Sequence, residues 1–141
     1  MNRKEFEILV AEGFERLPQW VRERIKNVAL LIEREPSKED RKREKLSQDE
    51  TLLGLYKGIP LSERGENYGI GATMPDTITL YKVPIEEAAI EDAMRSDLTA
   101  RDAVAKIIAE TVWHEFAHHF GMNEEDVQDR EQKREGNVPM I

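Results

Sequence analysis

The segment from Thr99 to Phe120 constrains the fold most, because apolar residues cover almost its whole circumference when it is drawn as a helix. Its apolar positions form two adjoining faces, made of Ala105, Ala109, Val112 and Phe116 and of Ala103, Ile107 and Thr111. Asp102, Lys106 and Glu110 form a narrow charged stripe. Thr99 suits the N-cap position. A helix that is apolar on nearly all sides is buried, so we predict that the rest of the chain packs around it.

The remaining segments predict one α+β domain over residues 1–141, a length that suits a single core. A helical stripe runs from Phe6 to Lys26 and is interrupted at Pro18, which disfavours the helical conformation in the residue before it. Three segments have the composition of strands, and a short helix follows the third. The expected strands are Val28–Ile32, Thr51–Lys57 and Thr77–Val83, and the short helix is Glu86–Met94. We expect a small mixed sheet of about three strands, packed on the buried helix, with Val28–Ile32 buried on both faces.

The stretch from Glu33 to Glu50 is almost entirely charged or polar. It lacks the apolar anchors that would hold it against a core. We expect a mobile loop at about residues 33–50, in which the basic run Arg41-Lys42-Arg43 is solvated.

Charge and composition exclude several classes of function. The net charge of -8 argues against a partner such as nucleic acid or an anionic membrane, since both attract clustered Lys and Arg. The chain has no cysteine, so any metal must be held by His, Asp or Glu. The charged N-terminus lacks a signal-peptide core, and no run approaches the ~18 apolar residues of a membrane span. A cytoplasmic location is the expectation.

The buried helix carries the motif H-E-x-x-H at His114, Glu115 and His118. Residues four apart share one face of a helix, so the two imidazoles can bind one zinc ion. Glu115 is turned about 100° away and can instead take a proton from water activated by the metal. All three histidines of the chain lie between positions 114 and 119. The pattern predicts a zinc-dependent hydrolase of peptide bonds, with Glu115 as the catalytic base.

A catalytic zinc site usually has a third protein ligand. Gly121 allows the chain to turn after the helix, and three carboxylates follow: Glu124, Glu125 and Asp126. Metzincins place a third ligand three residues after such a glycine, which favours Glu124. Asp126 and Glu125 remain alternatives.

Three segments resemble the minimal zincin-like metallopeptidases of bacteria, a family of small single-domain predicted peptidases. They are LLGLYKGIPLSERG (52–65), PDTITLYKVPIE (75–86) and HEFAHHFGMNEED (114–126), about half of the chain. The resemblance implies an α+β zincin core, and zinc bound by the two motif histidines and a downstream carboxylate. The methionine turn of metzincins is not evident; Met140 could serve, although a frayed terminus is the preferred interpretation.

Other residues near the motif are expected to have structural roles. We expect His119 to pack beside the site rather than to bind metal, and Trp113 and Phe120 to lie in the core. Tyr68 and Tyr81 could stabilise an oxyanion, but a structural role is favoured for both. Thr77–Val83 could be an edge strand that pairs with a peptide, although an internal strand is favoured. The alternative to a peptidase acting on a peptide or protein substrate is a non-catalytic metal-binding zincin module that binds a partner protein.

Overall fold

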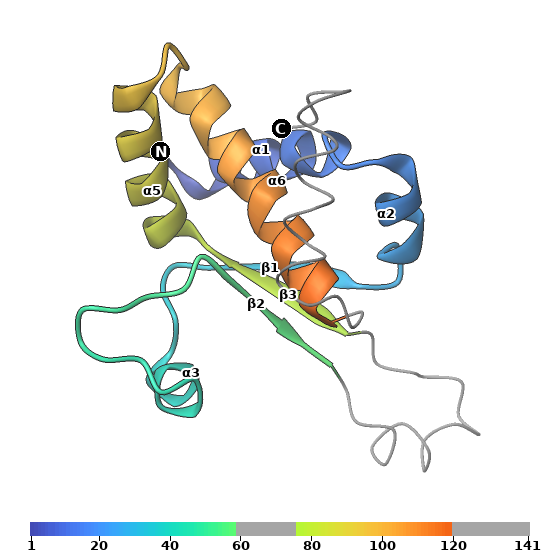
Figure 1. Ribbon diagram of the computed structural model, residues 1–141, viewed down its shortest axis with the longest axis vertical. Coiled ribbons are helices and arrows are strands. Elements are labelled where there is room, and N and C mark those ends of the chain that lie inside the picture. Colours follow the sequence, from blue (N-terminus) through green and yellow to red (C-terminus); the bar gives the residue numbers. More distant parts are fainter. Residues whose placement is uncertain (59–75, 120–141) are drawn as a thin grey trace.

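The computed structural model describes residues 1–58 and 76–119 (Figure 1). In chain order the elements are α1 (Arg3–Glu15), α2 (Gln19–Arg24), β1 (Ala29–Glu33), α3 (Lys38–Arg43), β2 (Gly54–Lys57), β3 (Thr77–Tyr81), α5 (Lys82–Arg95) and α6 (Ala100–His119). Helices and a mixed sheet share one hydrophobic core, which confirms the α+β class. Within these ranges no helix is long and apolar enough to cross a membrane.

Helix α6 lies at the centre of the fold, as its all-round apolar sequence predicts (Figure 1). It contacts α1, α5, β2 and β3. Eleven of its 20 residues are buried. The Thr99 side chain accepts a hydrogen bond from the Asp102 N–H at 3.1 Å, so the expected N-cap is confirmed. The site carried by the last turns of α6 is therefore fixed to the core along most of the helix.

The N-terminal helices cover one side of α6. Gly13 of α1 allows a close approach, because a Cβ placed there would lie 2.8 Å from the Ile108 Cγ2 of α6. Pro18 separates α1 from α2 as predicted and stands at the N-cap of α2. From α2, the Trp20 ring packs edge-on against Trp113 and Phe116 of α6. These contacts hold the face of α6 that lies away from the motif.

The sheet has the order β1-β3-β2, with β1 parallel and β2 antiparallel to β3. The expectation that the first strand is buried on both faces is wrong, since β1 is an edge strand and Leu31 is 44% exposed. β3 is the central strand, so it cannot be the edge that receives a peptide. It ends at Tyr81 rather than Val83, and α5 begins at Lys82 rather than Glu86. Pro84 fits into the first turn of α5, where a missing N–H costs no helical hydrogen bond.

The charged segment between β1 and β2 contains the helix α3, which was not predicted from the sequence. Ser37 caps α3 by accepting a hydrogen bond from the Asp40 N–H at 3.0 Å. The Asp40 side chain is buried and binds Lys57 Nζ of β2 at 2.9 Å. Four charged residues of α3 remain exposed, so the segment is solvated on its outer face only. Its mobility stays a prediction, but its description as an irregular loop is wrong at α3.

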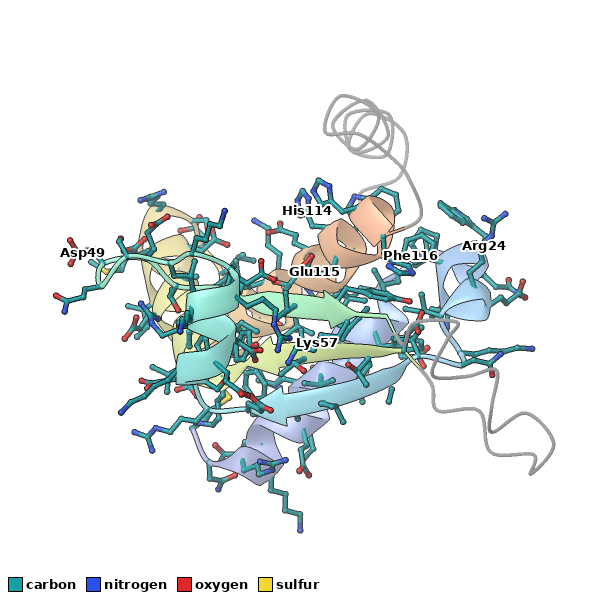
Figure 2. The ribbon with its side chains drawn as sticks, turned by 90° about the horizontal axis from the view of Figure 1, so that it is seen from below. Arg24, Asp49, Lys57, His114, Glu115 and Phe116 are labelled. Carbon is teal, nitrogen blue, oxygen red and sulfur yellow. The ribbon has the colours of Figure 1, made fainter. Side chains whose placement is uncertain are left out.

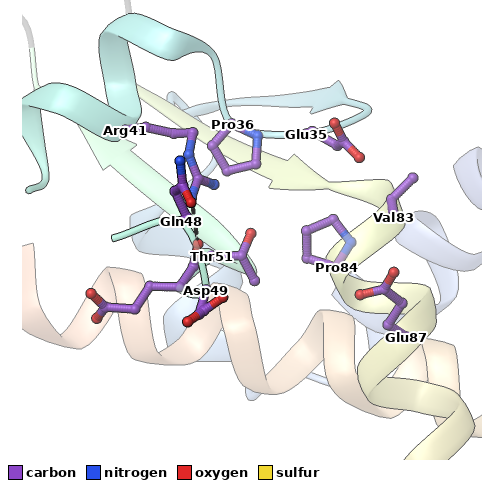
Figure 3. A pocket seen from close by; sticks show the side chains of 10 residues that line it. Glu35, Pro36, Arg41, Gln48, Asp49, Thr51, Val83, Pro84 and Glu87 are labelled. Carbon is purple, nitrogen blue, oxygen red and sulfur yellow. Dashed lines mark hydrogen bonds between the residues drawn. The ribbon is translucent and has the colours of Figure 1, made fainter. Parts of the chain in front are cut away.

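A second set of contacts folds this segment back on itself. The Arg41 guanidinium donates to the main-chain oxygens of Ser47 and Glu50, both at 2.7 Å. Together with the start of α5, the segment lines a polar cavity of about 460 Å³ (Figure 3). Arg41, which was expected to be solvated, therefore connects α3 to the end of the charged segment by hydrogen bonds.

Candidate metal centre

His114, Glu115 and His118 lie in the last two turns of α6. The two imidazole rings have centres 6.4 Å apart and planes inclined by 21°, so one ion can be accommodated between them. In Figure 2, Glu115 lies between α6 and β2, while Phe116 points toward α2. The helical spacing thus separates the roles of the motif residues: the histidines share one face, and the carboxylate is turned toward the sheet.

An open cleft of about 400 Å³ brings the three motif side chains together. Its other lining residues are Leu53 and Gly54 at the start of β2, and Glu110 and Thr111 one turn earlier on α6. Gly54 is needed here for lack of space, since a Cβ would lie 2.6 Å from Thr111 Cγ2 and 3.1 Å from the Thr79 oxygen. The absence of a side chain at Gly54 lets β2 pass directly over α6 and form one wall of the cleft.

Glu115 occupies an environment that makes its carboxylate more basic. Burial raises its pKa, and the negative charge of Glu44 adds to this effect. His118 and a hydrogen bond from the Tyr56 main-chain N–H act in the opposite direction without cancelling it. A raised carboxylate pKa suits a group that must accept a proton near neutral pH.

The donor set fits zinc. Two imidazoles on one helical face, an adjacent carboxylate that points elsewhere, and an open cleft are the features of a catalytic rather than a closed structural site. Within residues 1–58 and 76–119, no group of three or more His, Asp or Glu side chains could hold one ion. The predicted third ligand, Glu124, and its alternatives Glu125 and Asp126 lie outside the described residues. The described part therefore contains two candidate ligands and a candidate base.

His119 packs beside the site, in agreement with its expected role. Its ring lies 3.8 Å from that of Tyr56, nearly parallel to it. The Tyr56 hydroxyl donates to Asp76 Oδ2 at 2.9 Å, and His119 Nε2 lies 3.6 Å from the same oxygen. Tyr56 and Asp76 were not predicted as site residues from the sequence. In the sequence, Tyr56 lies near the end of one predicted strand and Asp76 directly precedes another. These positions do not indicate that the two side chains contact each other.

Tyr81 has a structural role, as favoured from the sequence. It is fully buried, and its hydroxyl donates to Asp40 Oδ2 at 3.4 Å. Burial raises its pKa, and the charges of Asp40 and Glu33 contribute further. Trp113 is fully buried, which confirms it as a core residue. The remaining candidates, Tyr68, Phe120 and Met140, lie outside the described residues.

Comparison with known proteins agrees with the site. A family model described as zincin-like metallopeptidase matches residues 25–134, which include the three strands of the sheet and the whole H-E-x-x-H motif. No curated protein matches the chain. Because the match extends over most of the sequence, the chain belongs to the zincin-like metallopeptidase family.

Proposed function

We propose that this protein is a zinc-dependent peptidase that hydrolyses peptide bonds with Glu115 as its general base. The observation that carries the proposal is the cleft itself. It joins two histidines suited to one ion, a carboxylate with a raised pKa, and the edge of a β-strand. A closed structural metal site needs neither the base nor the open cleft.

Each motif residue has a defined role in this proposal. His114 and His118 hold the ion together with a third carboxylate, for which Glu124 is the favoured candidate. When bound, zinc supplies a Lewis acid that lowers the pKa of water to about 7 and polarises a carbonyl group. Glu115 accepts a proton from the attacking water and delivers it to the leaving amine.

The edge of β2 supports a peptide as the substrate. Leu53 accepts a hydrogen bond from the Tyr81 N–H of β3, at 2.9 Å. Because the polar groups of an antiparallel strand alternate in direction, those of Gly54, which lines the cleft, face away from β3, while the outward-facing N–H of Tyr56 binds the Glu115 carboxylate. An extended peptide can pair with such an edge, which would place its carbonyl groups beside the motif.

The test compares Glu115→Gln with His114→Ala. Glu115→Gln should retain zinc and lower hydrolysis of a diverse peptide library by on the order of 10²–10⁴, because it removes only the base. His114→Ala should lose both zinc and activity. The matched control is Glu91→Gln, the same change on an exposed carboxylate of α5, which should behave as wild type.

Zinc content and hydrolysis separate the two functions considered. Wild-type protein that contains one zinc per chain but cleaves no member of the library would contradict a peptidase. That result would favour the metal-binding module that holds a partner protein.

A further inference from the structure

Tyr56 is the residue of β2 that reaches the motif by two separate routes. Its main-chain N–H donates to the Glu115 carboxylate. Its side chain contacts His119, the residue next to the metal ligand His118 in the sequence. One residue of the sheet therefore touches both the base and the turn of α6 that carries a ligand.

The side-chain contacts form a bracket of three residues: Tyr56, Asp76 and His119. The Tyr56 and His119 rings stack with centres 3.8 Å apart and an interplanar angle of 13°. The Asp76 carboxylate accepts from the Tyr56 hydroxyl at 2.9 Å and lies 3.6 Å from His119 Nε2, with both contacts on the same oxygen. Asp76 directly precedes β3, so the bracket connects the end of α6 to two strands.

Space around the bracket is limited, which makes its geometry specific. A Cβ added to Gly58, just after β2, would lie 3.3 Å from His119 Cε1 and 3.8 Å from an oxygen of Asp76. The backbone at Gly58 thus runs close to His119 and Asp76 and leaves little room for a side chain between them. A stacked pair that is also hydrogen-bonded at one end has little freedom to rotate.

We propose that Tyr56, assisted by Asp76, is a positioning residue that fixes the last turn of α6 and the Glu115 carboxylate for metal binding and catalysis. It touches no substrate and binds no metal in this scheme. It acts by holding His119, and through it the helical turn that presents His118. Removing a residue that orients the ligands of a metal site typically lowers the metal affinity by 10–100-fold. This inference rests on the proposed zinc site.

Tyr56→Phe tests the proposal, because it removes the hydroxyl that binds Asp76 and keeps the stacked ring. We expect the Co²⁺ affinity of the metal-free protein to fall about tenfold and the visible absorption bands of bound Co²⁺ to shift. Tyr56→Leu removes the ring as well and should cause a larger loss. Asp76→Asn keeps an acceptor for the hydroxyl but removes the charge that faces His119, and should also weaken Co²⁺ binding.

Tyr81→Phe is the matched control. It removes a buried tyrosine hydroxyl of β3 that donates to Asp40 of α3 rather than to a residue of the bracket, although Tyr81 also lies within electrostatic reach of Glu115. Its Co²⁺ affinity and spectrum should equal those of wild type. With a cleaved library peptide, Tyr56→Phe should lower kcat more than it raises KM, because the orientation of Glu115 matters mainly in the transition state.

The proposal is overturned if Tyr56→Phe and Tyr81→Phe have the same Co²⁺ affinity and spectrum as wild type. A loss of thermal stability in Tyr56→Phe without any change in Co²⁺ binding would also overturn it, since the residue would then be merely structural. If wild type binds Co²⁺ but cleaves no peptide, the peptidase proposal fails, while the Co²⁺ comparison still decides the role of Tyr56.

Discussion

Replacing Gly54 by alanine should force β2 away from α6, because the new methyl group would lie 2.6 Å from Thr111 Cγ2 and 3.1 Å from the Thr79 oxygen. Overpacking of this kind costs about 1–3 kcal/mol. The reduced freedom of the unfolded chain returns about 0.4–1 kcal/mol. The net loss of unfolding free energy should therefore be about 1–2 kcal/mol.

A second substitution identifies the clash as the cause. Thr111→Ser removes Cγ2 but keeps the hydroxyl that donates to the Ile107 oxygen at 2.7 Å. Alone it should cost about 1 kcal/mol for the lost buried methyl group. Combined with Gly54→Ala it should cost less than the sum of the single changes, because the alanine methyl then occupies the vacated space.

Thermal and urea unfolding of the four proteins measures this coupling. For a domain of about this size, each kcal/mol corresponds to roughly 2–4 °C in Tm. Gly54→Ala should also reduce peptidase activity, since it moves the strand that forms a wall of the cleft. Strict additivity of the two substitutions, or a Gly54→Ala variant as stable as wild type, would refute the close approach of β2 to α6.

Three further predictions concern the charged segment and the third ligand. Asp40→Asn should cost about 1–3 kcal/mol at pH 7, because it breaks a hydrogen-bonded ion pair with Lys57. The hydrogen bond from Lys57 holds the pKa of Asp40 below its usual 3.8, so this stability is present above about pH 4 and lost as the pH falls further. Urea unfolding should therefore show the difference in unfolding free energy between wild type and Asp40→Asn becoming smaller as the pH is lowered below 3.8. In amide exchange, the residues of α3 should be better protected than the rest of the segment between β1 and β2; uniform fast exchange would mean that the whole segment is mobile. Among alanine variants of Glu124, Glu125 and Asp126, Glu124→Ala should weaken zinc most in a chelator competition, and a larger loss from another of the three would reassign the ligand.

The buried helix and its histidines could be predicted because both depend on local spacing. An apolar surface on all sides of a helix requires burial, and residues four apart must share a face. The position of His114 and His118 therefore followed from the sequence without knowledge of the sheet. The α+β class followed from the order of the segments.

Strand positions within the sheet were harder to predict. The apolar run at Val28–Ile32 fits a central or an edge strand equally well, because its composition does not show how many neighbours it pairs with. The residues Tyr81-Lys82-Val83 have strand-like composition, yet the chain already turns into α5 at Lys82. Here the tertiary contacts of α5 with α6 outweigh local preference.

Contacts between distant segments could not be predicted. Asp40 appeared to belong to a solvated run, but it is buried because Lys57 and Tyr81 reach it from two strands. Tyr56 was missed for the same reason, since its partners Asp76, Glu115 and His119 come from other elements. Side chains whose role depends on such pairing have no periodic signal in the sequence.

The three motif residues lie on α6, but the main-chain partner of Glu115 lies on β2. This arrangement has a consequence for the order in which the site forms during folding. His114 and His118 are neighbours as soon as α6 is helical, and α6 packs against α5, the element that directly precedes it. The contact of Glu115 with Tyr56 instead requires β2 to close a long loop and dock, a slower kind of event in folding. A nascent chain can thus present its histidine pair before its base is aligned. If the proposed hydrolysis depends on the contact of Glu115 with Tyr56, activity requires the docked sheet, whereas the histidine pair requires only the helix.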